Sequence, residues 1–391
     1  MATAHKARRN RVEAGGVSSH NVEVVNIDGI EKHPNADRLD LAKIKGWQCV
    51  VGRDEYKAGD KVIYIPIDSV LSPECEKKLF SGGSKVVLHN GRVRTIKLRG
   101  QISQGMVAPL ALFGLEHIAV GSNVAELIGV SKYEPPSERA TNVVCAARQR
   151  PINNPMFHKY TGIENFKYWT DVFQDGEEIY VTEKIHGANF RAGWVRTHCN
   201  TLWKKIKRCF GLLPTYEFVY GSHNIQLQDK LFVKTYYKGN PYAKIVDQYN
   251  LKEVLEHGEV VYGEMYGHGI QANYTYGCGP DQHKLVVFDV KKEREDGAMR
   301  YLDTNELLDF CATRSLPIVP MLYAGPFDVH KIPALSRGKS LLSPAQRVRE
   351  GCVVRPIKEM AHELYNFMGG RKILKSINDD YLLDHSNTDN K

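Results

Sequence analysis

The sequence lacks any apolar run that could cross a membrane, because none of its hydrophobic stretches approaches about 18 residues. Residues 1–21 are polar and basic, without the apolar segment of a secretory signal. The eight cysteines include no Cys-x-x-Cys pair, which argues against a zinc site and against a disulfide framework. We therefore expect an intracellular protein of a reducing compartment, the cytoplasm or the nucleus, with no membrane partner.

Several catalytic motifs are also missing. The chain has no G-x-x-x-x-G-K followed by Ser or Thr, which excludes a P-loop ATPase. It has no G-x-S-x-G, and His362-Glu363 lacks the second histidine of an H-E-x-x-H zinc site.

The composition is that of an ordinary globular protein with two domains. Of the 391 residues, 42% are hydrophobic and 25% are charged, and a chain of this length is long for one core. The net charge of +8 indicates a mild preference for polyanionic partners, and by itself it is weak evidence of nucleic-acid binding. Residues 1–20 are expected to be a disordered basic arm, and 133–154, with Pro135-Pro136, a linker.

Residues 21–132 are predicted to form an OB-fold β-barrel. Short β-rich runs alternate with turn sequences, and about five strands suit this fold; the runs are 21–27, 39–44, 47–51, 61–66 and 93–98. The segment 33–39, His-Pro-Asn-Ala-Asp-Arg-Leu, resembles the opening of OB domains in tRNA-binding modules. Such barrels bind nucleic acid, and Arg94, Lys97 and Arg99 are candidate contacts to an RNA backbone. The alternative is a barrel that only braces the next domain.

Residues 155–391 mix strands and helices, which predicts an α+β domain with antiparallel sheets around a cleft. We expect strands near 178–184, 189–196, 217–220, 259–266, 285–291 and 352–355, and helices near 242–257, 304–314 and 344–349. A further helical pattern, 202–210, spaces Trp203, Ile206 and Phe210 among four cations. We favour an amphipathic segment packed on the domain over a helix that grips RNA.

The most informative motif is Glu183-Lys184-Ile185-His186-Gly187-Ala188-Asn189-Phe190. Lys184 follows an alternating strand and precedes a turn glycine, a place where metal ions and neighbouring cations can make an amine nucleophilic. Four further motifs follow in order: Gly263-Glu264, Phe288-Asp289, the segment 350–356 and the lysines Lys372 and Lys375.

This ordered set resembles the covalent nucleotidyltransferases, the superfamily of ATP-dependent ligases and capping enzymes. The wording K-I-H-G-x-N-F is most similar to the RNA ligase 2 family, and residues 157–165 resemble the segment that opens its catalytic domain. The resemblance covers about residues 155–380.

The resemblance implies roles for individual residues. Lys184 would attack the α-phosphorus of ATP, and Glu264 and Glu350 would lie near Mg²⁺ or Mn²⁺. Nucleotide contacts would come from Glu183 toward the adenine edge, Phe288 by stacking, and Ile185, His186 and Asn189 of the lysine motif. For His186 a packed turn residue is the alternative.

The last motif departs from the K-x-K of the family. Lys372 and Lys375 lie three apart, so both cannot face one side of a strand. We favour Lys375 as the residue that faces the α-phosphate and keep Lys372 as the alternate. His223 takes the place of a family arginine, and Arg355 is a weaker candidate for substrate phosphate.

The prediction is an ATP-dependent RNA ligase that joins 3′-hydroxyl and 5′-phosphate ends, acts on RNA-containing nicked duplexes and is a monomer. A DNA ligase or a GTP-using capping enzyme is the nearest alternative, although both usually carry K-x-D-G where this chain has His186. A non-catalytic RNA-binding protein on a ligase scaffold is the alternative from another class.

Overall fold

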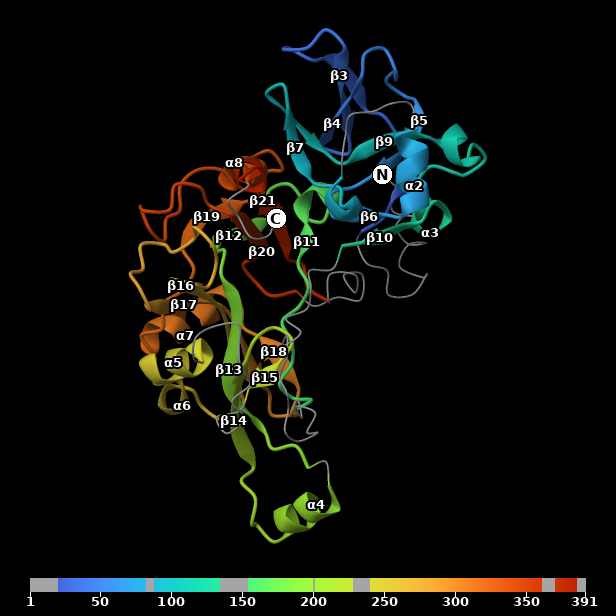
Figure 1. The fold of residues 1–391 in the computed structure, drawn as a ribbon. Helices are drawn as coiled ribbons and strands as arrows, with labels where there is room; N and C mark the ends of the chain where they lie inside the picture. The colour runs from blue at the N-terminus through green and yellow to red at the C-terminus, as the bar shows by residue number, and fades with distance from the viewer. Residues whose placement is uncertain are drawn as a thin grey trace.

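The computed structural model describes residues 20–81, 88–133, 154–199, 201–227, 240–360 and 370–384. The expected basic arm, apart from its last residue, and residues 134–153 of the expected linker lie outside these ranges. The chain forms two parts, a small β-rich region and a larger domain that continues to the C-terminus (Figure 1). No helix in the described ranges is long and apolar enough to span a bilayer.

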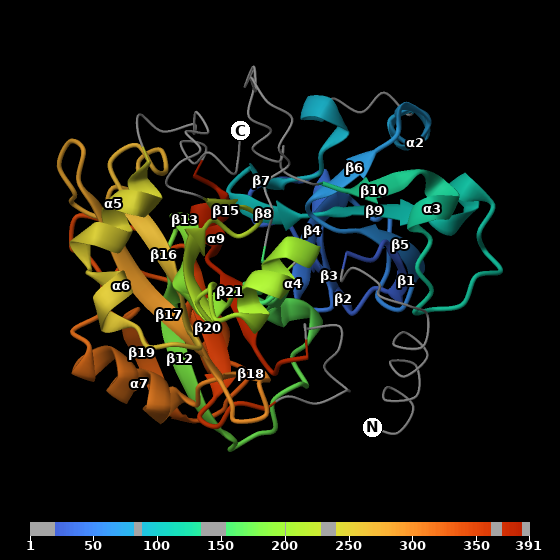
Figure 2. The same ribbon diagram turned by 90° about the horizontal axis from the view of Figure 1, so that it is seen from below.

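The N-terminal part consists of short strands arranged as the OB-fold prediction requires. One sheet has the order β1 (Glu23–Asn26), β5 (Lys61–Ile65), β9 (Met106–Pro109), and a second has β2 (Gly29–Lys32), β3 (Leu39–Ile44), β4 (Trp47–Gly52). Two further pairs are β7 (Thr95–Leu98) with β8 (Gln101–Gln104), and β6 (Ser69–Leu71) with β10 (Val130–Lys132). Trp47, Cys49 and Val51 of β4 are buried and alternate with less buried neighbours, which is the period of a sheet with one face on the core. The short helices α2 (Pro73–Leu79) and α3 (Ala125–Ile128) lie at the edge of this part (Figure 2).

The C-terminal domain contains two sheets. The five-stranded sheet has the order β11 (Glu164–Asn165), β21 (Leu374–Ile377), β20 (Gly351–Pro356), β12 (Glu178–Lys184), β19 (Met321–Pro326). The six-stranded sheet has the order β15 (Gln226–Leu227), β14 (Tyr216–Gly221), β13 (Ala188–Arg196), β16 (Glu259–Gly267), β17 (His283–Glu293), β18 (Met299–Tyr301). All neighbours are antiparallel except β11 and β21.

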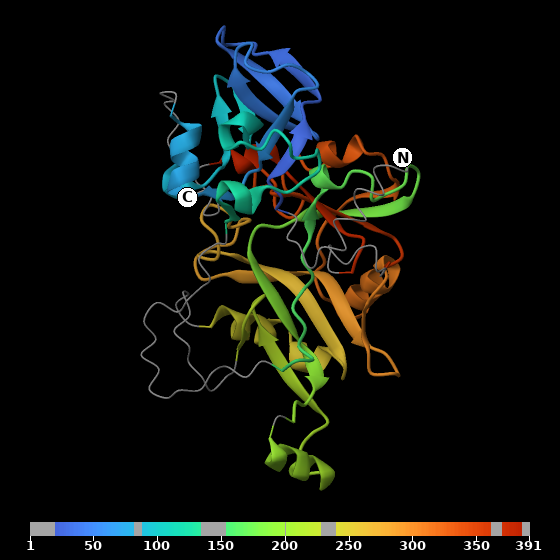
Figure 3. The same cartoon turned by 90° about the vertical axis from the view of Figure 1, so that its right-hand side faces the viewer.

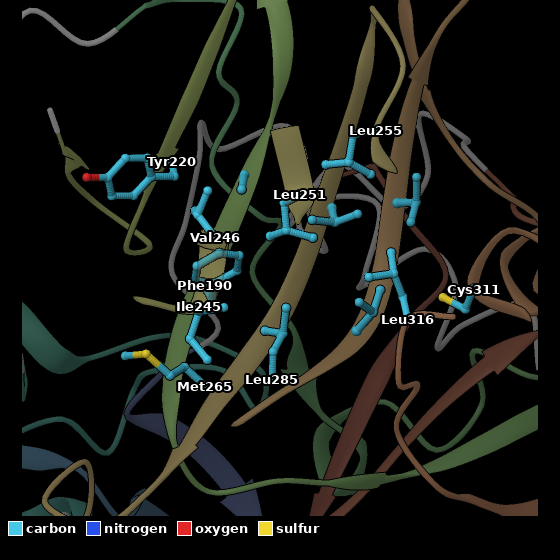
Figure 4. Packing of buried hydrophobic residues seen from close by; sticks show 14 of the residues in the cluster. Phe190, Tyr220, Ile245, Val246, Leu251, Leu255, Met265, Leu285, Cys311 and Leu316 are labelled. Carbon is cyan, nitrogen blue, oxygen red and sulfur yellow. The ribbon is translucent and has the colours of Figure 1, made fainter. Parts of the chain in front are cut away.

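The largest core lies between the six-stranded sheet and the helices α5 (Pro241–Gln248), α6 (Leu251–Val254) and α7 (Thr304–Thr313). Figure 4 shows Phe190 of β13 and Leu285 of β17 turned toward helix residues such as Ile245 and Leu251. Helices α5 and α7 begin at side-chain caps. The Asn240 side chain accepts from the amide of Ala243 with a proline following, and Asp303 and Glu306 form a capping box.

Two helix predictions are corrected. The expected helix 242–257 is broken because Asn250 adopts a left-handed conformation with φ of 48°, which separates α5 from α6. Residues 344–349 form turns instead of a helix. The guanidinium of Arg349 donates to the carbonyl oxygens of Lys339 and Leu335, and these bonds hold the segment against its own upstream loop. The helix in this region is α8 (Lys331–Leu335).

The packed orientation expected for the segment 202–210 is also wrong. Helix α4 (Leu202–Cys209) stands at the tip of the β13–β14 hairpin, away from the rest of the domain (Figures 1 and 3). Its large apolar side chains are exposed, with Trp203 at 73% and Phe210 at 75%.

The two parts of the chain meet through a small polar and aromatic contact. The Lys167 ammonium lies 4.5 Å from the Trp47 ring centroid and donates to the Gln104 side chain at 2.9 Å. Asp379 of α9 (Asp379–Leu382) accepts from the Gln104 amide at 3.0 Å. The barrel therefore does brace the C-terminal domain, whatever else it binds.

Candidate active site

A pocket of about 360 Å³ opens between the two sheets of the C-terminal domain. The chain passes from one sheet to the other at this point, because β12 ends at Lys184 and β13 begins at Ala188. Gly187 makes the close passage possible, since a Cβ on it would lie 2.3 Å from the carbonyl oxygen of Met265. The described lining residues include Lys184, Asn189, Glu264, Phe288 and Lys375.

Lys184 and Glu350 form the polar centre of the pocket region. The Lys184 ammonium lies 2.5 Å from Oε1 of Glu350, and the two side chains are 27% and 7% exposed. The strand register sets this pair: Lys184 is opposite Gly351 in the β12–β20 ladder, and Glu350 directly precedes that glycine. Two residues 166 positions apart are thus placed in contact by sheet pairing.

The residues present fit a divalent metal ion bound largely through water. The second carboxylate oxygen of Glu350, Oε2, is buried and accepts no hydrogen bond among the described residues. A buried carboxylate oxygen without a donor fits a cation or its bound water. In the described part of the chain no three His, Cys, Asp or Glu side chains cluster as a metal cage. This arrangement suits Mg²⁺ or Mn²⁺, which keep several waters and use one or two carboxylates.

The lysine motif is held by its neighbours across the sheet. Glu264 lies opposite Asn189 in the β13–β16 ladder, and its Oε1 accepts from the amide of Gly187 at 3.1 Å. Asn189 Oδ1 is buried and accepts no hydrogen bond within the described residues, as a ligand-facing atom would be. Ile185 is buried and lines the pocket.

His186 lies behind the pocket and is absent from its described lining. The backbone amide of His186 donates to the Tyr276 hydroxyl, and its Nδ1 is 3.1 Å from the Tyr381 hydroxyl. Its ring packs edge-to-face on Tyr274, and Nδ1 is 3.9 Å from Oε2 of Glu350. The geometry places His186 as in the packed alternative, a turn histidine held among tyrosines.

Glu183 lines the pocket and is 1% exposed. Its Oε2 accepts from the amide of Leu341 at 2.7 Å, whereas Oε1 accepts no hydrogen bond in the described ranges. Burial raises the pKa of this carboxyl above its usual range, against the opposing effect of Ser340 and the neighbouring amides. A buried acceptor of this kind can recognise the amino edge of a base.

Phe288 and Asp289 are consecutive residues of β17 that make different contacts. Phe288 lines the pocket and packs edge-to-face on Tyr160, with ring centroids 4.8 Å apart. Asp289 is fully buried next to the same tyrosine, accepts from the Tyr160 hydroxyl and pairs with Arg371 at 2.8 Å. The strand continues past this pair to Glu293, two residues beyond the predicted end at 291.

Arg355 is held by the same carboxylate, because its Nη1 lies 3.5 Å from Asp289. It is 5% exposed but lines the pocket. His223 also lines the pocket, and burial, Lys159 and Arg191 lower its pKa. The guanidinium of Arg191 donates to the carbonyl oxygens of Ser222 and Phe157, which fixes the loop that carries His223.

Lys375 and Lys372 differ sharply in position. Lys375 lies on β21 opposite Val353 and lines the pocket, where burial and then the Lys184 charge lower its pKa. Lys372 precedes the strand and is 5% exposed. It forms an ion pair with Glu177 at 2.6 Å, and it is absent from the described pocket lining. Of the two alternatives, only Lys375 is placed beside Lys184.

We expect Lys375→Met to raise the melting temperature at neutral pH. The folded pKa of Lys375 lies below its ordinary value of 10.5, so the folded state binds fewer protons than the unfolded state between these two values. The charged lysine therefore weakens folding below its folded pKa, and this penalty fades as the pH rises toward the unfolded value. The variant should melt about 2–4 °C higher near pH 7, with convergence at alkaline pH. Thermal denaturation followed by circular dichroism, at pH 7 and at alkaline pH, measures the difference in melting temperature and its disappearance.

Lys372→Met is the matched comparison and should have the opposite sign. It leaves Glu177, 20% exposed, without its ion-pair partner, at a cost of about 1–3 kcal/mol. A lower melting temperature for Lys375→Met than for wild type would contradict the assignment of the pocket position.

The three candidate cations of the barrel lie in different surroundings. Lys97 lines a second cleft of about 700 Å³ between the two parts of the chain, together with Lys43, Trp47 and Arg337. Arg99 lies in the tight turn between β7 and β8 with φ of 47°. Burial and the neighbouring Arg92 lower the pKa of Arg94. The three cations do not line the smaller pocket in the described ranges.

Several lining residues have no individual role in the sequence interpretation. Four of them belong to the segment that opens the domain: Tyr160, Thr161, Gly162 and Ile163. The resemblance of this segment to the family was the only sequence signal that could have placed them in the pocket. Ile318 and Val319 come from a loop before β19 and carry no motif.

The fold and the pocket together define a ligase-type protein, with an OB-fold region followed by a catalytic domain of antiparallel sheets. The RNA ligase family matches residues 177–377, and the chain belongs to this family. An OB-fold domain family matches residues 21–110. The resemblance stated from the motifs is thereby confirmed.

Solved structures of Naegleria gruberi RNA ligase share the fold. A lysine-to-methionine variant with AMP and Mn is 21% identical, with a TM-score of 0.67 over 92% of this chain and 97% of that one. The structure of the same ligase with PPi is 21% identical, with a TM-score of 0.67 over 94% of this chain and 98% of that one. The phenylalanine–tRNA ligase beta subunit of Oceanobacillus iheyensis is 29% identical over 136 residues, which are 32% of this chain and 15% of that protein.

Proposed function

We propose that this RNA ligase family member uses ATP to seal 3′-hydroxyl and 5′-phosphate ends, through an AMP adduct on Lys184. The observation that carries the proposal is the placement of Lys184 in a pocket beside one carboxylate, Glu350, and a second cation, Lys375. Lys184, Lys375 and Arg355 bring cations to this pocket, where they can contact the phosphates of a nucleotide. A Naegleria gruberi RNA ligase of the same fold has been solved with ATP and Mn.

The first step forms a bond between Nζ of Lys184 and the α-phosphorus, and breaks the bond from that phosphorus to pyrophosphate. The amine must first give up a proton, and Oε1 of Glu350 at 2.5 Å is the acceptor in reach. The AMP then passes to a 5′-phosphate of the nucleic acid, and a 3′-hydroxyl displaces it to close the strand. All three are in-line displacements at phosphorus, so the side chains align groups and neutralise charge.

The other pocket residues bind and orient the nucleotide in this proposal. Phe288 offers a ring face for the base, and Glu183 offers a buried carboxylate oxygen to its edge. Asn189 and Glu264 lie opposite each other, where they would contact the ribose or hydrated metal of a bound nucleotide. A metal ion at Glu350 and Glu264 would supply charge neutralisation at the phosphates. Lys375 adds a fixed cation for the α-phosphate.

The rival functions are separated by adduct and sealing assays on the full chain. We expect adduct formation with ATP and not with GTP, and sealing of nicked duplexes that carry RNA on the 3′-hydroxyl side. Four nicked duplexes that differ only in the sugars flanking the nick, assayed by gel electrophoresis, test this preference. Equal sealing with DNA at the 3′-hydroxyl would indicate a DNA ligase, and an adduct with GTP would indicate a capping-type enzyme. No adduct with either nucleotide, in Mg²⁺ or Mn²⁺, would favour a non-catalytic RNA-binding protein.

A further inference from the structure

The tip of the β13–β14 hairpin carries an exposed apolar surface that the ligase site does not use. The strands end at Arg196 and Tyr216, which face each other in register, and the segment between them contains α4. Four side chains are more than two-thirds exposed: Leu202 at 73%, Trp203 at 73%, Phe210 at 75% and Leu212 at 71%. We call these four, with Ile206, the tip residues.

The helix sequence places most of its apolar and cationic residues on different sides. At 100° per residue, Leu202, Trp203, Ile206 and Cys209, together with Phe210 directly after the helix, fall on one side of α4, and Lys204, Lys207 and Arg208 on the other. The segment 197–216 contains no Asp or Glu. A helix of a soluble domain normally shows the same division with its apolar side toward the core.

Here the apolar side is not packed on a core, and residues on both sides of α4 are exposed. The Lys204 ammonium donates to the carbonyl oxygen of His198 at 3.4 Å, and Arg208 approaches the Cys199 sulfur at 3.9 Å. His198 and Cys199 belong to the connection that leads back to the domain. Lys204 thus contacts the connection to the domain, whereas Lys207, Arg208 and the tip residues are exposed to solvent. The helix itself stands away from the rest of the domain (Figures 1 and 3). The surface is exposed because α4 projects from the end of the β13–β14 hairpin, and the exposure includes all five tip residues.

We propose that α4 is a peripheral anchor that docks this protein on a membrane surface rich in anionic lipids. A short helix with Trp, Phe and Leu on one side and only Lys and Arg on the other lies in the bilayer interface, with its apolar side among the acyl chains. The cations flank that side at the level of anionic headgroups, to which they are complementary in charge. Such an anchor does not span the bilayer, so it is compatible with the lack of a spanning helix in the described ranges.

The observations favour a lipid surface over RNA. A phosphate backbone pairs with cations but covers no apolar side chain, whereas the tip residues expose apolar surface. Binding RNA through the cations would also leave the tip residues in water. The hairpin position keeps the anchor apart from the catalytic pocket, since the nine residues of β13 span about 30 Å. A docked protein therefore keeps its pocket open to nucleotide and nucleic acid.

The test is flotation of the full chain with vesicles of phosphatidylcholine alone or with about 30% phosphatidylserine. We expect binding to the anionic vesicles, at least about tenfold weaker binding to the neutral ones, and release by salt. Trp203→Ala with Phe210→Ala should weaken binding to anionic vesicles by at least about tenfold. Leu127→Ala, which removes an apolar side chain that is 64% exposed on the barrel, is the matched control and should bind as wild type. The paired variant should form the AMP adduct at the wild-type rate, because the tip is outside the pocket.

Tryptophan fluorescence gives a second readout. The chain has four tryptophans; Trp47 and Trp169 are buried and Trp194 is partly buried, whereas Trp203 is 73% exposed. Anionic vesicles should shift the emission to shorter wavelength in the wild type. Trp203→Phe should lose this shift and still float with the vesicles.

Three results would overturn the proposal. The first is failure of the wild type to bind either kind of vesicle at low salt. The second is weaker binding of a nicked duplex by the paired tip variant without any vesicle binding, which would make the tip an RNA contact. The third is a concentration-dependent dimer that the paired variant abolishes, which would assign the surface to a second copy of the chain.

Discussion

Lys184→Ala should abolish transfer of label from α-labelled ATP to the protein, with a loss of at least about a thousandfold. The side chain supplies the only atom that the proposed adduct bonds to, so no neighbouring group can replace it without a change of geometry. Gel autoradiography after incubation with metal and ATP measures the adduct. Lys284→Ala, which removes an exposed lysine of β17, is the matched control and should label as wild type.

The alanine variant also leaves Glu350 as a buried carboxylate without its ion-pair partner, so a loss of labelling needs to be separated from a loss of folding. Lys184→Arg makes this separation. Arginine keeps a positive charge toward Glu350 but stays protonated and is a poor nucleophile. It should fold with a melting temperature near that of wild type and form no adduct. Persistent labelling in either variant would show that another residue is the nucleophile.

Glu350→Gln should slow adduct formation by about a hundredfold or more. The amide has nearly the same shape as the carboxylate, but it carries no charge for the Lys184 ammonium at 2.5 Å or for a metal ion. Rapid-quench measurement of the first turnover isolates this step from strand sealing. Sealing of a pre-adenylylated nick in the same variant shows how much the later step depends on the carboxylate.

Glu253→Gln changes an exposed glutamate of α6 and is the control for the loss of one negative charge. It should leave the first turnover unchanged. A first-turnover rate for Glu350→Gln within about threefold of wild type would remove Glu350 from the chemistry. The pair with Lys184 would then be a structural ion pair.

Most of the motif residues line one pocket in the structure, and the motifs that contain them depend on short-range chemistry. A strand that ends in lysine before a glycine gives a fixed amine at a turn, and Lys184 is found there at the end of β12. The strands near 178–184, 259–266 and 285–291 were predicted within a few residues, since their alternating or apolar runs reflect burial on a sheet.

Other features could not be read from local pattern. The helix predicted at 344–349 failed because tertiary bonds from Arg349 hold the segment in turns. His186 matched a family motif but packs among tyrosines that come from 88 and more residues away, so its surroundings are decided by the fold. The amphipathic period of α4 was visible, but a period does not say which way the apolar side points.

The sequence by itself determined the order of the motifs, the strand-end lysine and the division into a β-rich part and an α+β part. These follow from residue type and spacing, which act over a few residues. Only the tertiary structure decided that Lys375 and not Lys372 stands beside Lys184, and that Glu350 is the partner of that amine. The reason is that sheet register joins strands far apart in the chain, and a shift of one residue would turn each side chain to the other face.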